Sequence, residues 1–144
     1  MAVIVPATAY LPLAGGVMTG DLTTSAHIQA NGTAPSAIAG AASGGSPPAP
    51  VVVNGSNDVA GRITFGTGTT PGAGIQVAVT YAAAWTVPGG GNVHVVVCPI
   101  NAATQALGLF VSNPTANGFN LACASAPAGS QPSNTYAFSF IAIG

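Results

Sequence analysis

Charge is what this sequence has least of. Among its 144 residues the only cation is Arg62 and the carboxylates are Asp21 and Asp58, so charged residues make up 2% of the chain. An ordinary soluble domain holds about a quarter. The net charge of −1 excludes the basic surface with which proteins bind nucleic-acid phosphates. A surface with so little electrostatic repulsion also favours coverage by a partner protein.

Groups that could perform catalysis are equally scarce. The carboxylates, imidazoles and thiols of the chain are Asp21, Asp58, His27, His94, Cys98 and Cys123. General acid–base catalysis needs several such groups in one site, so we predict no enzyme activity, no catalytic residue and no cofactor. A metal site at His27 and His94 would need a further ligand, and none is predicted. Asp58 is expected to cap a turn or to pair with Arg62.

The two cysteines permit one disulfide at most. Residues 1–15 lack the basic region of an export signal, which favours free thiols and leaves the pairing of Cys98 with Cys123 open. Cys123 is expected on a buried strand face with Phe119 and Leu121. The apolar runs fall short of the ~18 residues that a membrane-spanning helix needs, so no membrane insertion is predicted.

Short apolar alternations, broken by glycine, proline and asparagine, fill the chain after residue 50. Alternation of this kind with β-branched and aromatic residues predicts strands. Seven are expected, near residues 51–54, 61–66, 74–81, 92–98, 107–112, 118–124 and 135–143. One helical turn is compatible with residues 101–107. Short strands with frequent turns predict an all-β fold, a small antiparallel β-sandwich or jelly roll.

Two of these strands indicate which residues face the core. One side of the third strand holds Ile75, Val77, Val79 and Tyr81. The run 93–98 is expected to pair with this strand across a chain reversal at the glycine-rich residues 89–92. The predicted core face of the last strand holds Tyr136, Phe138 and Phe140.

The composition divides the chain into three parts. Residues 1–32 form an N-terminal anchoring or trimer-neck segment, and residues 51–144 form the β-sandwich domain, expected to fold without the rest. Residues 33–50 read TAPSAIAGAASGGSPPAP. Small residues with glycine, serine and proline bury little apolar area, which is typical of a linker.

Residues 10–22 carry the most specific motif of the chain. The segment LPLAGGVMTGDL resembles a segment of many bacteriophage tail-fibre and head-fibre proteins, in which it lies at the foot or neck of a homotrimeric fibre. The resemblance implies a homotrimer with an extended N-terminal arm. The residues that it assigns to anchoring on the virion are Tyr10, Leu11, Leu13, Gly15, Gly16 and Met18.

The β-region more diffusely resembles a β-sandwich module of phage fibre and virion-surface proteins. The shared features are Asp-x-Ala-Gly at 58–61, Pro-x-Asn-Ala-Ala at 99–103, Gly-Phe-x-Leu at 118–121 and a closing aromatic strand at 135–144. The chain differs from a full-length fibre in being far shorter and in having no shaft repeat.

These resemblances imply a structural protein of a phage virion, a homotrimeric capsid decoration or head-fibre protein. Its arm would dock on the major capsid protein or another shell protein, while the β-domain projects. The alternative is a receptor-binding tail-fibre tip or minor tail protein that binds a host surface glycan, with Trp85, Asn113 and Asn117 as candidate contacts. A lone tryptophan is more often part of a core or subunit interface. Either protein would lie on the virion surface after assembly in the host bacterial cytoplasm, and head or tail position stays open.

Overall fold

The computed structural model describes residues 30, 32–87 and 92–144, and this part of the chain is nearly all β. Its elements are β1 (Ser36–Ala39), β2 (Val51–Val52), β3 (Ala60–Thr67), β4 (Gly74–Thr80), β5 (His94–Pro99), α1 (Ala102–Gln105), β6 (Leu109–Thr115), β7 (Gly118–Cys123) and β8 (Gln131–Ile143). All seven strands expected from the sequence are present, within a few residues at their ends. The helical turn after β5 is confirmed as α1, whose first turn is capped by the side chain of Asn101.

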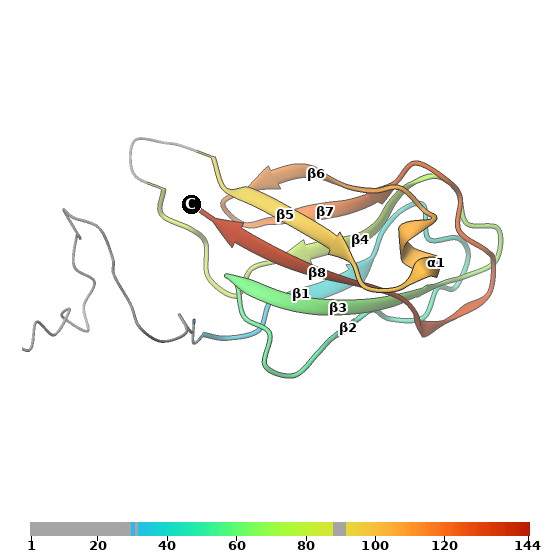
Figure 1. Ribbon diagram of the computed structural model, residues 1–144, viewed down its shortest axis with the longest axis horizontal. Helices are drawn as coiled ribbons and strands as arrows, with labels where there is room; N and C mark the ends of the chain where they lie inside the picture. The colour runs from blue at the N-terminus through green and yellow to red at the C-terminus, as the bar shows by residue number, and fades with distance from the viewer. Residues whose placement is uncertain (1–29, 31, 88–91) are drawn as a thin grey trace, which may run out of the picture.

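The strands form two antiparallel four-stranded sheets (Figure 1). The β4–β7 sheet has the strand order β1-β4-β7-β6, and the β3–β8 sheet has the order β2-β3-β8-β5. Consecutive strands therefore often belong to different sheets. The expected pairing of the runs 75–81 and 93–98 is wrong. Strand β4 lies between β1 and β7, whereas β5 pairs with β8. The connecting residues 88–91 lie outside the described part of the chain.

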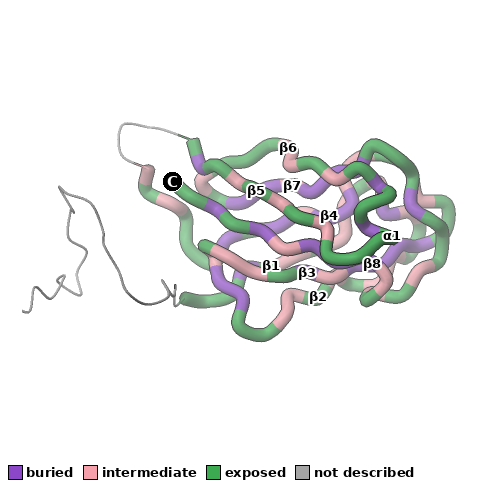
Figure 2. The backbone as a smooth tube through the Cα atoms, in the orientation of Figure 1, coloured by how far each residue is buried: buried purple, intermediate pink, exposed green. Residues whose placement is uncertain are grey.

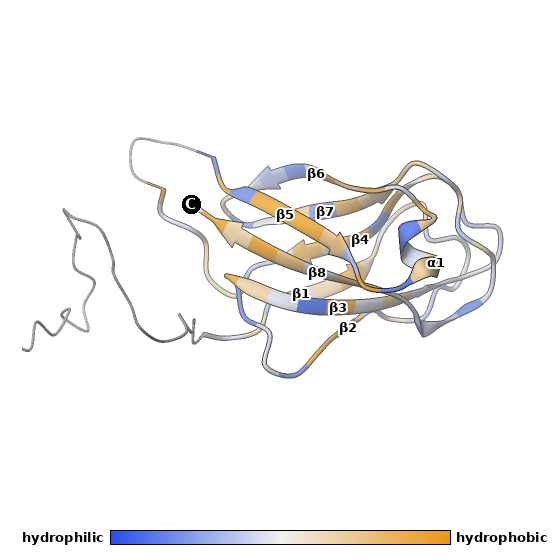
Figure 3. Cartoon of the chain, in the orientation of Figure 1, coloured by the Kyte–Doolittle hydropathy of each residue, from blue (hydrophilic) through white to orange (hydrophobic). Residues whose placement is uncertain are grey.

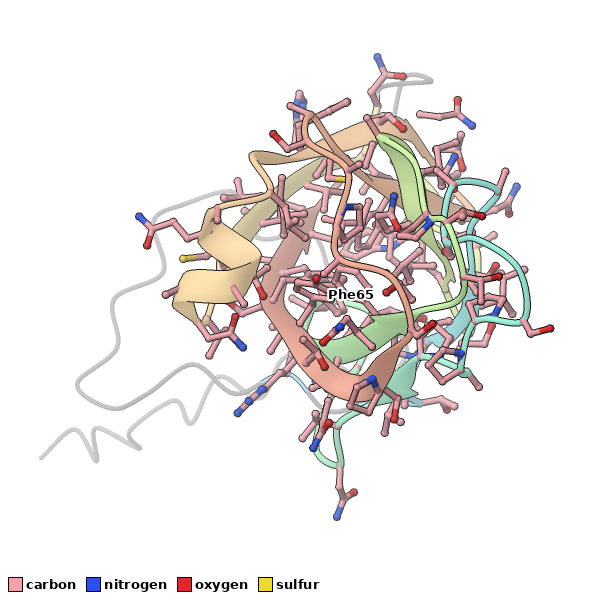
Figure 4. All side chains as sticks on the ribbon, turned by 90° about the vertical axis from the view of Figure 1, so that its right-hand side faces the viewer. Phe65 is labelled. Carbon is pink, nitrogen blue, oxygen red and sulfur yellow. The ribbon has the colours of Figure 1, made fainter. Side chains whose placement is uncertain are left out.

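The core lies between the two sheets and is built largely of aromatic side chains. Phe119 of β7 contacts Phe140 of β8 with ring centroids 5.4 Å apart, which joins one sheet to the other. Phe65 of β3 is fully buried at the centre and stacks on Tyr136 at 5.1 Å (Figure 4). The predicted core face of Tyr136, Phe138 and Phe140 is confirmed, since all three are buried. Each such side chain contributes about 1.5–3 kcal/mol by leaving water.

Alternation within the strands separates the inner and outer faces of each sheet. Buried residues alternate with more exposed ones along β8 and gather on β7 (Figure 2). In β4, Val77, Val79 and the following Tyr81 face the core as expected. A bulge between Ile75 and Val77 breaks the pattern, so Ile75 pairs with Ala122 and does not join this set.

The linker expected over residues 33–50 is wrong, because part of it is a strand of the sheet. Residues 36–39 form β1, and all four of them pair with β4. Beyond β1 the backbone N–H of Gly40 donates to Gln76 at 2.8 Å, and the fully buried Ser43 Oγ donates to the same carbonyl at 2.7 Å. A small residue is needed here because the backbone after β1 lies close to that of β4: a Cβ at Gly40 would lie 2.4 Å from the carbonyl oxygen of Ile75. The β-domain therefore begins well before residue 51.

We predict that a chain beginning at residue 51 is much less stable than one beginning at residue 30. The shorter chain loses β1, the buried Ser43 hydroxyl and the cover over one edge of β4. Several hydrogen bonds, each contributing about 0.5–1.5 kcal/mol, disappear together, so the free energy of unfolding should fall by at least about 3 kcal/mol. Urea unfolding of both chains measures this. Equal midpoints and slopes would contradict the role assigned to β1.

Candidate functional site

A shallow hollow of about 180 Å³ lies on the outer face of the β4–β7 sheet. We call it the polar hollow. Its lining residues are Ala78, Val79, Thr80, Asn113, Thr115, Asn117, Gly118, Phe119 and Asn120. They come from β4, from the end of β6, from the turn that joins β6 to β7 and from β7, so three strands and a turn meet there.

Strand alternation points the small and polar side chains of β4 and β7 toward the hollow. Val79 and Phe119 point into the core and contribute backbone to the lining. Their neighbours therefore point outward: Ala78 stands opposite Asn120, and Thr80 opposite Gly118. A side chain at 118 would collide with the sheet, since a Cβ there would lie 2.0 Å from the carbonyl oxygen of Val79. Gly118 and Ala78 thus provide a low floor between taller polar side chains.

Hydrogen bonds fix the wall that the β6–β7 turn supplies. Thr115 Oγ1 donates to the carbonyl of Gly118 at 3.1 Å and accepts from the backbone N–H of Asn117 at 3.2 Å. The carbonyls of Ala116 and Asn117 accept backbone N–H groups of Trp85 and Tyr81, at 2.8 and 2.9 Å. The turn is therefore fastened both to itself and to the segment that follows β4.

Asn113 reaches the hollow through an irregularity of β6. The register between β6 and β7 shifts between Ser112 and Thr115. Asn113 lies in this bulge with a φ of +49°, in the left-handed region that asparagine tolerates better than most residues. The bulge re-aims the chain at the edge of the sheet, as bulges often do beside functional sites.

The chemistry of the polar hollow is that of neutral hydrogen bonding. No charged residue lines it. Within the described part of the chain, the side-chain amides of Asn113, Asn117 and Asn120 make no hydrogen bond. Each amide carries both donors and acceptors, so the site offers both kinds of group to a ligand. Its nine lining residues include no carboxylate, imidazole or thiol, so what the hollow presents is neutral donors and acceptors.

A larger hollow of about 550 Å³ lies where Ala30, Gly32 and Ala34 approach the end of β2 and the connection from β2 to β3. Its most polar side chain, Asn57, is already engaged: Nδ2 donates to the carbonyl of Ala30 at 2.8 Å, and Oδ1 accepts from the backbone N–H groups of Val59 and Ala60. That hollow therefore presents fewer free polar side chains than its size suggests. We regard the polar hollow as the better candidate site.

The structure brings together two of the three predicted glycan contacts. Asn113 and Asn117 both line the polar hollow. Trp85 does not: it is half-buried against the core, with its ring centroid 6.1 Å from that of Tyr81 and its indole nitrogen buried. Thr80, Thr115 and Asn120 were missed, although the outward position of Asn120 between two core residues is readable from the alternation Phe-Asn-Leu. The predicted anchoring residues Tyr10, Leu11, Leu13, Gly15, Gly16 and Met18 lie outside the described residues.

The titratable side chains are dispersed. Asp58 caps a turn as expected, but a distant one: its carboxylate accepts from the backbone N–H groups of Ala82 and Ala83 at 2.8 and 3.0 Å. The expected alternative, an ion pair with Arg62, is not formed. His94 is exposed. Across residues 30, 32–87 and 92–144, no three His, Cys, Asp or Glu side chains gather closely enough to hold a metal ion. Asp21 and His27 are not among these residues.

Both described thiols are free, as favoured from the sequence. Cys123 is buried on the predicted strand face with Phe119 and Leu121, and this environment raises its thiol pKa. Burial is the main cause of that rise. Cys98 instead lies exposed on β5. The two cysteines thus belong to different sheets and different environments.

The outer face of the β3–β8 sheet has the opposite character. Val96, Ile141 and Ile143 are 68%, 53% and 64% exposed. Val96 and Ile141 are direct cross-strand partners, and Ile143 pairs with His94. We call these three residues the apolar face. Figure 3 shows most of β5 and the C-terminal part of β8 in hydrophobic colours, whereas the end of β6 is hydrophilic.

Comparison of the chain with protein-family models, with curated proteins and with solved structures gives no match. Among the residues that the structure describes, no helix is long and apolar enough to span a membrane. The proposed function therefore rests on the two outer faces and on the sequence motifs.

The phenol of Tyr81 gives a pH-dependent prediction. Burial, with a smaller contribution from the Asp58 charge, raises the pKa of Tyr81 from 10.0 to about 12. Because the folded protein holds this proton more tightly than the unfolded chain, stability from this group is full below pH 10 and falls as pH rises toward 12. Tyr81→Phe should flatten the loss of stability in that window, measured by urea unfolding at stepped pH.

Tyr136→Phe is the matched control for this substitution. The Tyr136 hydroxyl accepts from the backbone N–H of Ala128 at 3.1 Å. Its loss should lower stability already at neutral pH, whereas Tyr81→Phe removes a hydroxyl with no partner among the described residues. An alkaline stability loss that is identical in wild type and Tyr81→Phe would contradict the assignment.

Proposed function

We propose that this chain is a structural protein of a bacteriophage virion surface, a homotrimeric capsid decoration or head-fibre protein. In fold terms the two packed sheets are a β-sandwich that projects from the particle, and the N-terminal arm docks on the major capsid protein or another shell protein. The segment LPLAGGVMTGDL and the marks of the β-region support this proposal through their resemblance to phage fibre proteins. The structural observation that carries it is the apolar face.

The apolar face has the properties of a contact surface between subunits. Three large aliphatic side chains, each more than half exposed, lie on neighbouring strands. Contiguous apolar surface of this kind on a soluble domain marks an interaction site more often than scattered exposed residues do. The nearest charged position in the sheet is Arg62, opposite Ser139, and no carboxylate lies on these strands. Arg62 is exposed on the same outer face, two residues along β3 from the partner of Ile141, so each copy brings one cation beside this contact and no other charged side chain of these strands.

β5 adds backbone groups to the same surface. It is an edge strand of the β3–β8 sheet, and edge strands offer N–H and C=O groups to a neighbouring chain. Such groups are hardly screened by salt, and neither is apolar burial. Both features suit a subunit contact in a chain with three formal charges.

We predict that the double variant Val96→Asp with Ile141→Asp abolishes self-association of the full chain. Two carboxylates on the apolar face would repel their copies across any symmetric contact and would have to be desolvated. Sedimentation velocity at micromolar concentration should show a trimer for the wild type and a monomer for the variant. Ile38→Asp is the control, because Ile38 is 65% exposed on the outer face of the other sheet.

A trimeric double variant, or a wild-type monomer, would defeat the subunit contact at the apolar face. Loss of the trimer in Ile38→Asp alone would move the contact to the β4–β7 sheet. Circular dichroism of each variant separates loss of association from loss of folding, since all three substituted side chains are exposed.

The virion assignment has its own test. Quantitative mass spectrometry of purified particles should find the chain as a stoichiometric component that resists moderate salt. Hundreds of copies per particle support the head, whereas a handful support the tail. A chain that is absent from purified particles, or that moderate salt strips off, would refute the proposal.

A further inference from the structure

We propose that the polar hollow is a binding site for a neutral saccharide, held by the amides of Asn113, Asn117 and Asn120. This inference goes beyond the virion assignment and does not rest on it. It concerns the outer face of the β4–β7 sheet, whereas self-association was argued from the other sheet.

The first step is the absence of charge around the hollow. None of its nine lining residues is ionisable at neutral pH. Phosphate, sulfate and carboxylate ligands are recognised by cationic side chains or helix N-termini, and metal ions by carboxylate, imidazole or thiolate groups. The hollow has none of these groups. A ligand that suits it is uncharged and rich in hydroxyl or amide groups.

The second step is the supply of donors and acceptors. The three amides and the Thr80 hydroxyl come from three strands and a turn, and they border one floor of Ala78 and Gly118. An amide can accept from one hydroxyl and donate to another, which matches the vicinal hydroxyl groups of a sugar ring. Asn117 and Thr115 are held by the hydrogen bonds of the turn. Little ordering of the wall is then needed on binding, which favours affinity.

The third step is size. The volume of about 180 Å³ is below the roughly 300–1,000 Å³ of pockets that enclose a drug-sized ligand. The hollow therefore suits a single ring, and the remainder of an oligosaccharide can extend across the open face. The shallow shape is unsuited to a ligand that needs enclosure on all sides.

The fourth step is the pair of exposed apolar side chains on the same face. Phe110 is 47% exposed on β6, where it pairs with the outward-facing Ala122. It lies two residues before Ser112, about 7 Å along the strand from the row that contains Asn120. Ile38 is 65% exposed and stands opposite Ala78. Neither side chain lines the hollow, but sugar rings have apolar C–H faces, so Phe110 and Ile38 are suited to contact the part of an oligosaccharide that extends beyond it across the outer face.

The test is a titration of the full chain followed by nitrogen-15 NMR, because asparagine side-chain amides give their own signals. The probes are a neutral hexose, a 6-deoxyhexose and an N-acetylhexosamine, each as the free monosaccharide and as a short oligosaccharide. Sialic acid and a sulfated oligosaccharide are the charged comparators. We expect saturable shifts of the side-chain amides of Asn113, Asn117 and Asn120 with at least one neutral probe.

The matched variants are Asn117→Ala with Asn120→Ala, and Asn134→Ala as the control. Asn134 is an exposed asparagine on β8, outside the hollow. The double variant should lose at least tenfold in affinity for the active probe, whereas Asn134→Ala keeps it. Phe110→Ala should weaken binding and Phe110→Tyr should restore it, since either aromatic ring can cover a sugar face. Well-dispersed amide spectra and an unchanged oligomeric state establish that the variants fold.

Three results would overturn the inference. They are the absence of saturable amide shifts with every neutral probe, binding of the charged comparators alone, and unchanged affinity in the double variant. A peptide that instead perturbs the backbone amides of the β6 edge would mark a protein contact in place of a saccharide site. None of these results bears on self-association through the apolar face.

Discussion

The structure depends on the aromatic contact between its two sheets. Phe119 and Phe140 join the β4–β7 sheet to the β3–β8 sheet, and Phe65 packs against Phe138 in the same core. Because strand alternation has a period of two, fixing these side chains inward fixes every neighbour outward. Asn120 therefore faces water next to Phe119, and Ile141 does so next to Phe140. The character of both outer faces follows from one buried layer.

Lack of charge imposes the second constraint. With so few ions, the connections between strands are held by neutral side chains bonded to backbone. Buried Thr104 of α1 accepts from the backbone N–H of Ala137 in β8 at 2.7 Å and donates to Asn101. Buried Gln76 donates to the carbonyl of Gly72 at 2.8 Å. The bonds to Ala137 and Gly72 satisfy backbone groups that would otherwise be costly to bury, and the bond to Asn101 satisfies the Thr104 hydroxyl. Such bonds are insensitive to salt, and so is the subunit contact proposed at the apolar face.

Much of the fold could be predicted from the sequence, and the failures have physical causes. Strands such as β8 can be recognised because the aromatic residues Tyr136, Phe138 and Phe140 alternate with the small residues Ala137 and Ser139. β1 was missed because Ser36–Ala39 is rich in alanine, and its assignment to the sheet comes from its partner β4 and not from its own propensity. Strand partners are set by the connections between sheets, which local patterns do not specify. The site was half predictable: Asn113 and Asn117 carry turn signals, while the contribution of Thr80 depends on the register between β4 and β7.

The two outer faces are complementary in their consequences. They belong to sheets packed face to face, so they point away from each other (Figure 1). A contact that covers Val96, Ile141 and Ile143 leaves Asn113, Asn117 and Asn120 exposed to water. Association then removes apolar surface without closing the polar hollow, and it repeats the hollow once per subunit on the outside of the assembly. Weak binding of a sugar at each copy would be strengthened by this repetition, since linked sites act at a high effective concentration. In the proposed assembly the apolar face and the polar hollow are therefore compatible, and self-association would multiply a site that a single subunit presents only once.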